Sequence, residues 1–251
     1  MALGMQFLII GWLVLQLTGS ASQLGLVIFL YGIPNLLLLM FGGILADRLD
    51  RRKMLIYSQF VVTVLVLGVA LLTMAQLISI WHIYAVAVVL GVIQGINMPS
   101  RLAIIPDLVG QEDILNATSL NMAVFNTGRI IGPSIAGGII DYVGLGHALL
   151  INSFLYGFGV VFLILMSGVV SRSAPRSENI FMGMWQGFKY SAATPVAFTL
   201  VGLSFAFGFF GGAYIQVLPA FAKEVLRVNA SGAGSLISAS GLGSLVGNMW
   251  L

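Results

Sequence analysis

The stretch Gly43-Ile44-Leu45-Ala46-Asp47-Arg48-Leu49-Asp50-Arg51-Arg52-Lys53 places six charged residues between two long uncharged runs. No Asp, Glu, Lys or Arg occurs in residues 1–46 or in residues 54–100. A cluster of basic residues between apolar runs is typical of a short loop at a membrane surface. The stretch therefore predicts a polar loop with a hydrophobic helix leaving it on each side.

The composition of the whole chain points to lipid as its solvent. Apolar residues make up 59% of the chain and charged residues 8%, and the mean hydropathy is +1.05. A soluble domain carries about 25% charged residues, because water must wet its surface. The net charge of +3 does not indicate nucleic-acid binding, since the basic residues lie in predicted loops and form no face. The absence of Cys excludes disulfides and thiolate metal sites.

Cut by length, the apolar runs predict eight membrane-crossing helices. A helix that rises 1.5 Å per residue needs about 20 residues to cross about 30 Å of hydrocarbon, and lipid offers a non-helical backbone no hydrogen-bond partners. A cleavable signal peptide is an alternative explanation of the first run, but no basic residue precedes it and more apolar runs follow. The expected crossings are two in residues 1–46 with a turn at 18–22, two in residues 54–100 with a turn near 75–81, and one each in 114–140, 142–171, 190–222 and 228–251.

The basic residues predict the orientation of these helices. Basic residues concentrate in cytoplasmic loops, so the richer set of alternate loops should face the cytoplasm. One set holds Arg48, Arg51, Arg52, Lys53, Arg101, Arg172, Arg176 and Lys189. The other set holds only Lys223 and Arg227, while Arg129 falls inside a predicted helix.

A weak internal repeat predicts the domain organisation. A shift of 209 residues aligns Gly25 with Gly234 and Gly32 with Gly241, as expected for two similar helical halves. The same shift carries Gly43 one position past Leu251, where a second charged loop is expected. We therefore expect a truncated chain: a six-helix bundle in residues 1–171 with an incomplete first helix, a cytoplasmic linker in 172–195, and the first two helices of a second bundle in 196–251.

Several motifs together resemble one family of membrane proteins. The spacing Gly-x3-Asp-Arg-x2-Arg-Arg in residues 43–52 resembles the loop between the second and third helices of the major facilitator superfamily. Residues 99–101, 105–109, 115–117 and 129–133 are similar to the subfamily of efflux permeases that contains the enterobactin exporter. The resemblance implies an all-α polytopic membrane protein of twelve helices, about eight of them present, that exports a small molecule in exchange for protons.

The resemblance gives the charged loop a role in switching conformation. It implies a conformational latch that holds the two halves in the outward-facing state, formed by Gly43, Asp47, Arg48, Arg51 and Arg52. Asp50 departs from the family pattern, which more often has Gly or an apolar residue there. The alternative is a charge cluster that only sets the topology of the chain.

A second motif lies in the predicted fifth helix. Its residues resemble the antiporter motif of the drug exporters of the superfamily and are Gly128, Arg129, Gly132, Pro133 and Gly137. Gly128, Gly132 and Ala136 are four residues apart, so they form one smooth stripe for a neighbouring helix, and Pro133 bends the helix beside it. The resemblance implies contact with the eighth helix. The alternative is that these small residues only pack helices.

Polar residues inside the predicted helices are candidates for lining a substrate cavity. Arg129 lies near the middle of its helix, where an Arg costs at least about 2.5–3.5 kcal/mol and must face a cavity or a partner. It is a candidate for binding an anionic or carbonyl-bearing substrate, or for tying a helix kink. The other candidates, each of which has a rival role in holding helices together, are Tyr31, Asn35, Gln94 and Asn126.

The acidic residues leave proton coupling without an obvious carrier. None is expected to be buried in a helix, because Asp47, Asp50, Asp107, Glu112, Asp113, Asp141, Glu178 and Glu224 all fall in predicted loops or at helix ends. Asp141, at an outer helix end, is the nearest candidate. The chain shows no catalytic constellation and no metal-spaced His cluster, so we expect no enzyme activity, no cofactor and no metal site.

The leading interpretation is a monomeric, multi-pass secondary transporter of the bacterial inner membrane that exports small molecules by alternating access, by antiport with protons. An importer of the same fold is one alternative, since a fold does not fix the direction of transport. A membrane-embedded enzyme or a non-transporting scaffold is the other. The sequence does not identify the substrate.

Overall fold

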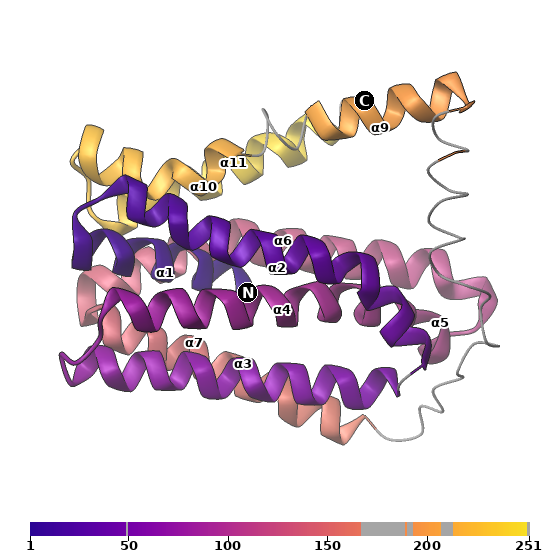
Figure 1. The fold of residues 1–251 in the computed structure, drawn as a ribbon, viewed down its shortest axis with the longest axis horizontal. Coiled ribbons are helices and arrows are strands. Elements are labelled where there is room, and N and C mark those ends of the chain that lie inside the picture. Colours follow the sequence, from indigo (N-terminus) through magenta and orange to yellow (C-terminus); the bar gives the residue numbers. More distant parts are fainter. Residues whose placement is uncertain (49, 167–188, 190–192, 207–212, 250–251) are drawn as a thin grey trace.

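The computed structural model describes residues 1–48, 50–166, 189, 193–206 and 213–249, and Figure 1 shows how they are arranged. Side chains are described within these ranges except at 40–48, 111, 204–205, 213 and 245–249. Most of the predicted linker 172–195 therefore lies outside the described residues.

The described residues form helices joined by short turns, with no strand among them. The helices are α1 (Ala2–Thr18), α2 (Ala21–Arg48), α3 (Arg51–Met74), α4 (Ile80–Ala103), α5 (Ile105–Leu108), a 3-10 turn (Gln111–Asp113), α6 (Ile114–Val143), α7 (Leu145–Leu165), α9 (Pro195–Ala206), α10 (Ala213–Ala220), a π-helical turn (Phe221–Val225) and α11 (Ala230–Met249). We call α1–α7 the first group of helices and α9–α11 the second group.

A helix occupies each predicted crossing. The first six crossings correspond to α1, α2, α3, α4, α6 and α7, and the eighth corresponds to α11. The seventh corresponds to α9 and α10, which lie on either side of the undescribed residues 207–212. The predicted all-α architecture and the predicted positions of the helices are therefore confirmed.

The surface of the helices suits lipid. Four described helical segments are long and apolar enough to cross a membrane: α3, α4, α7 and the Ala21–Leu39 part of α2. Large apolar side chains such as Trp81, Leu115 and Phe158 are more than 60% exposed. An exposed apolar surface of this extent marks contact with a membrane or a partner, and here it covers the outside of a helical bundle.

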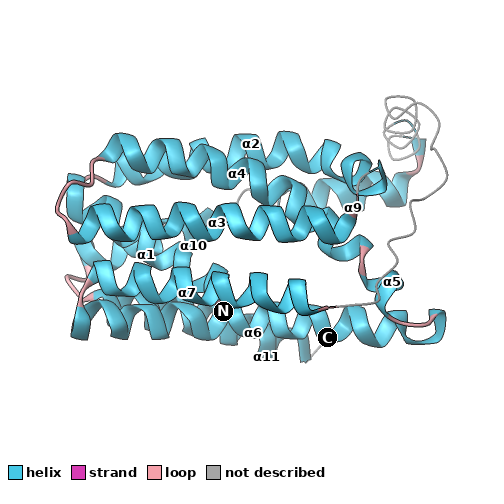
Figure 2. Cartoon of the chain, turned by 90° about the horizontal axis from the view of Figure 1, so that it is seen from below, coloured by secondary structure: helices cyan, strands magenta, loops and turns pink. Residues whose placement is uncertain are grey.

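The first group packs around α1. Met5, Leu8, Ile9 and Leu13 of this helix are at most 1% exposed, because α1 lies against α2, α6 and α7. Around it, α2 packs along α4 and α3 packs along α7, and Figure 2 shows these helices running side by side along one axis. A helix that is apolar on all sides is expected at such a central position.

Local capping sets the helix ends that matter for the site. Gly19 ends α1 in the left-handed conformation, with φ of 59°, and its N–H donates to the Leu15 carbonyl. The carboxylate of Asp50 begins α3 by accepting hydrogen bonds from the backbone N–H groups of Arg52 and Lys53 at 3.0 and 3.2 Å. The residue that departs from the family pattern is thus the N-cap of α3.

Candidate functional site

A cavity of about 1200 Å³ lies between the two groups of helices. Its walls come from α1, α2, α4 and α6 of the first group and from α10 and α11 of the second. Among the polar and aromatic lining residues are all five of the predicted cavity residues, Tyr31, Asn35, Gln94, Asn126 and Arg129, together with Gln6, Phe125, Tyr214, Gln216, Ser240 and Ser244. The structure therefore brings the candidates onto one surface.

Arg129 faces this cavity from the middle of α6. Its side chain is exposed, although its neighbours Gly128 and Ile130 are buried against other helices. It makes no hydrogen bond or ion pair with any described residue. Of the two environments that an intramembrane Arg can have, a partner or a wet cavity, the described part of the chain offers the cavity.

A side pocket of about 70 Å³ opens beside the large cavity and shares Gln6, Tyr31 and Gln94 with it. Gln59, Asn97, Arg101 and Tyr156 complete its polar lining. Sequence reasoning did not assign Arg101 to a cavity. A signal existed, because Gln94, Asn97 and Arg101 are spaced at i, i+3 and i+7 and so share one face of α4.

Hydrogen bonds hold part of this pocket in place. The Tyr156 hydroxyl donates to the Gln6 side-chain oxygen, and the Asn97 amide donates to the Ser58 hydroxyl at 2.9 Å. These bonds join α1 to α7 and α4 to α3. Gln59 of α3 also donates to the Tyr156 carbonyl at 3.4 Å, so the pocket is built inside the first group of helices.

The small residues of α6 pack against two different helices. Gly128 and Gly132 lie against α1, and a Cβ on Gly132 would be 2.9 Å from the Met5 nitrogen. Gly137, which lies outside the stripe, instead faces α11, where a Cβ would collide with the Ala230 carbonyl oxygen. The predicted stripe therefore packs on α1, and the contact with the eighth crossing is made by an adjacent face of α6.

This adjacent face forms a close seam between the two groups. The Ser134 hydroxyl donates to the Ser238 hydroxyl at 2.7 Å, and Ser238 donates in turn to the Ile130 carbonyl. A Cβ on Gly234 would collide with the Pro133 carbonyl oxygen, so the two backbones touch there as well. Such close backbone approach is how membrane helices associate without a hydrophobic driving force between them.

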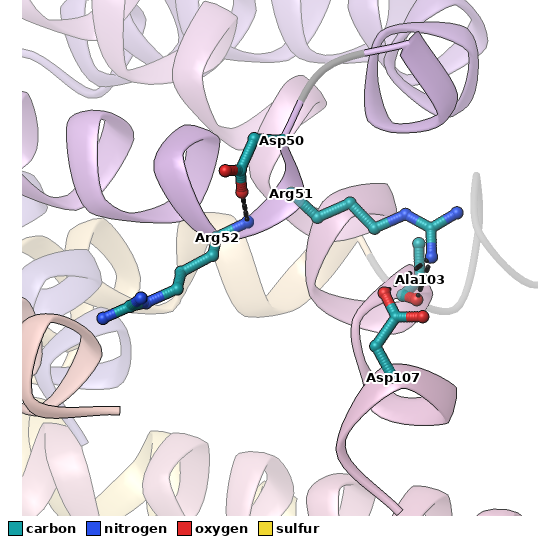
Figure 3. Close-up of polar contacts among 5 residues, drawn as sticks. All are labelled: Asp50, Arg51, Arg52, Ala103 and Asp107. Carbon is teal, nitrogen blue, oxygen red and sulfur yellow. Dashed lines mark hydrogen bonds and ion pairs between the residues drawn. The ribbon is translucent and has the colours of Figure 1, made fainter. Parts of the chain in front are cut away.

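The charged residues Asp50, Arg51 and Arg52 lie at the start of α3, and Figure 3 shows their contacts. The Arg51 guanidinium donates to the Asp107 carboxylate and to the Ala103 carbonyl, both at 2.9 Å. Asp107 lies in the four-residue helix α5, outside the predicted crossings as expected, and its side chain is only 8% exposed. Burial is tolerated because the charge of Arg51 compensates it.

Arg52 extends the same loop to α7. Its guanidinium donates to the carbonyls of Leu163 and Ile164, at 3.2 and 2.7 Å, at the C-terminal end of that helix, where the backbone dipole favours a cation. The side chains of Gly43, Asp47 and Arg48, the other predicted latch residues, lie outside the described residues. The latch therefore stays a prediction.

Comparison with known proteins identifies the family. The model of a family described as transmembrane secretion effectors matches residues 2–251, almost the whole chain. The chain belongs to the transmembrane secretion effector family. This assignment confirms the resemblance to the major facilitator superfamily and the expectation of a membrane transporter fold rather than an enzyme.

Curated relatives narrow the resemblance within this family. The chain is 27% identical over 248 residues to the staphyloferrin A transporter of Staphylococcus aureus. This match covers 96% of the chain and 61% of that relative. It is 26% identical over 238 residues to the enterobactin exporter EntS of Salmonella choleraesuis, and 27% identical over 240 residues to EntS of Shigella boydii. Each of these two matches covers 92% of the chain and 55% of the relative. The chain thus spans little more than half the length of these relatives.

Two charged residues join the two groups at the end of the bundle that the sequence predicts to lie outside the membrane, called the outer end below. The Asp141 carboxylate, at the end of α6, accepts hydrogen bonds from the backbone N–H groups of Ala230 and Ser231 at 3.1 and 2.9 Å. An acidic group stabilises a helix N-terminus in this position, so Asp141 caps α11 from another helix. The residue considered as a proton carrier is therefore engaged in a contact between the groups.

The second outer contact involves Lys223. Its ammonium donates to the Leu15 carbonyl at 2.7 Å, near the C-terminal end of α1, and lies 5.6 Å from the centre of the Trp12 ring. Partial burial lowers the pKa of Lys223, while Glu224 acts in the opposite direction.

Within the described residues no group of three or more His, Asp or Glu is placed to hold a metal ion.

Proposed function

We propose that this protein is a secondary active transporter of the bacterial inner membrane that exports small molecules by alternating access, in exchange for protons. The observation that carries the proposal is the position of the cavity between two groups of helices, with Arg129 on its wall and no described residue paired with its guanidinium. In related carriers, substrate sites lie near the middle of the membrane at the interface of two structural repeats.

The contacts between the groups support alternating access. At the outer end, Asp141 and Lys223 each reach from one group to a helix terminus of the other. A carrier that rocks around a central site must break such contacts when it opens to the outside. The described arrangement is therefore proposed to be a state closed at that end.

The relatives support small-molecule export. Those from Salmonella and Shigella are named as enterobactin exporters and the one from Staphylococcus as a staphyloferrin A transporter. A cavity of about 1200 Å³ exceeds the 300–1000 Å³ of common ligand pockets, so it accommodates solutes of drug size or larger. We propose cargo of this size class and name Tyr31, Asn35, Gln94, Asn126 and Arg129 as its binding residues.

Coupling to protons is proposed to involve Asp141. None of the described residues that line the cavity is an Asp or a Glu. Protonation of Asp141 would remove the negative charge that caps α11 and weaken its hydrogen bonds to the Ala230 and Ser231 amides. A proton that arrives from outside would thus loosen a contact that must break for the cavity to open.

A transport assay on the full-length protein tests the proposal. Arg129→Lys keeps the charge and loses the planar group that grips carboxylates and carbonyls, so efflux per molecule of inserted protein should fall by about tenfold or more. Arg227→Lys, in the exposed turn between the π-helical turn and α11, is the matched control and should transport normally. Enterobactin and staphyloferrin A serve as first probes in proteoliposomes with an imposed pH gradient. Normal efflux by Arg129→Lys would remove Arg129 from the site, and gradient-independent movement would remove proton coupling.

A further inference from the structure

The charged side chains among the described residues that line the two adjoining pockets are all of one sign. Arg129 lines the large cavity and Arg101 lines the side pocket, and no Asp or Glu is among the described lining residues of either. Neither Arg makes a hydrogen bond or ion pair with a described residue. Two cations on connected surfaces, neither paired with a described residue, favour a solute that carries negative charge.

The backbone positions of the two Arg residues lie at different depths along the bundle. Counted from the outer ends of their helices at 1.5 Å per residue, Arg129 lies about 21 Å from Val143, and Arg101 lies about 32 Å from Ile80. These helix ends lie on the same side of the molecule, because Gly146 beside α6 contacts Met74 beside α4. The two Cα atoms are therefore about 10 Å apart along the helix axes.

The groups between the two cations are neutral. Gln6, Tyr31 and Gln94 line both pockets, and Asn97 and Gln59 line the side pocket. Amides and hydroxyls donate hydrogen bonds to carboxylate or phenolate oxygens without adding charge. Phe125, which also lines both pockets, offers an apolar surface to the body of a solute.

We propose that Arg101 and Arg129 form a two-point anion site, in which an elongated solute with two acidic groups places one in the side pocket and the other in the large cavity. This rests on the proposed transport function and adds the chemical class of the cargo: small molecules with at least two anionic groups separated by a linker. A neutral or cationic solute of the same shape leaves both guanidinium groups without a partner and binds more weakly.

Binding measurements with a graded set of acids test the site directly. The probes are linear α,ω-dicarboxylates from succinate to sebacate, with the dimethyl ester of each, titrated into the purified full-length protein by calorimetry. Long diacids should bind at least about tenfold more tightly than their esters and than succinate, because only they reach both cations. Arg101→Gln and Arg129→Gln should each abolish the preference for long over short diacids. Lys53→Gln, which removes an exposed charge outside both pockets, should keep it.

Three outcomes overturn the site: equal affinity for acids and esters, no dependence on chain length, or an unchanged length preference in Arg101→Gln. The result is separable from the proposed function. Proteoliposomes that bind long diacids but transport neither them nor enterobactin would contradict transport and keep the site. Transport that continues with no preference for the diacid over its ester would contradict the site and keep transport.

Discussion

The two ends of this protein, which the sequence predicts to lie outside and in the cytoplasm, use charged side chains in opposite ways. At the outer end, Asp141 and Lys223 cross between the two groups of helices. At the other end, the described bonds of Arg51 and Arg52 stay within the first group. The contrast indicates that cytoplasmic charges fasten one group internally, whereas outer charges fasten a boundary that a carrier has to open.

At both ends, charged side chains bind helix termini. Asp141 lies at the N-terminus of α11, while Lys223 and Arg52 lie at the C-terminal ends of α1 and α7. Each charge has the sign that the helix dipole favours, and such a contact is typically worth about 0.3–1 kcal/mol. Contacts of that size hold a closed state without making it permanent.

The largest effect on stability is expected at the cytoplasmic end. Asp107→Ala leaves the Arg51 guanidinium, whose side chain is 11% exposed, without its carboxylate partner. Removing one member of a buried pair costs about 3–5 kcal/mol, so thermal unfolding of the purified protein should occur at a markedly lower temperature. Lys53→Gln, which breaks an exposed ion pair of 3.8 Å, is the control and should leave the transition unchanged. Equal transitions for both variants would show that the cytoplasmic cluster does not stabilise the first group.

A smaller effect is expected at the seam between the groups. Gly137→Ala places a methyl group against the Ala230 carbonyl oxygen, a backbone atom that can move only with α11. Overpacking of this kind costs about 1–3 kcal/mol and should reduce transport. Gly138→Ala is a matched control on the same helix, because a Cβ there meets nothing within 4 Å. Transport that falls equally in both variants would show that helix propensity, and not the seam, is responsible.

The positions of the helices could be predicted from the sequence, because length and the absence of charge determine where a chain crosses a membrane. Charged residues do end or begin described helical segments at Arg48, Arg51 and Asp113. The rotation of each helix was harder to predict. A face toward lipid and a face toward another helix are both apolar, so Gly128 and Gly137 could not be assigned to α1 and α11 in advance.

The cavity was partly predictable for the same reason. Polar residues are rare in these helices and have to face one another or a cavity. The sequence therefore identified Gln94 and Arg129 as cavity residues, and both line the cavity. Contacts between residues far apart in the sequence could not be predicted in this way. Asp141 meets Ala230 across 89 residues and Lys223 meets Leu15 across 208, and the sequence placed Asp141 only at a helix end and Lys223 only in a loop.

The smallest effect on stability, and the most informative one for transport, is expected at Asp141. Asp141→Ala removes the acceptor for the Ala230 and Ser231 amides, which costs about 1 kcal/mol. Because this contact joins the two groups, its loss should favour opening at the outer end while the thermal transition shifts little. A cysteine at Ser240, on the cavity wall, reports that opening, since the sequence contains no other Cys. An impermeant thiol reagent added from outside should label it several-fold faster in the Asp141→Ala background than in the parent.

Asp141→Asn separates the charge from the hydrogen bond in the same assay. The amide oxygen can still accept one bond from the end of α11, but the negative charge is gone, as it would be after protonation. Labelling at the fast rate of Asp141→Ala would indicate that the charge holds the outer end closed and would agree with proton control of this contact. Labelling at the parent rate would leave Asp141 as an ordinary helix cap, and the outer boundary would then depend on Lys223 and the α6–α11 seam.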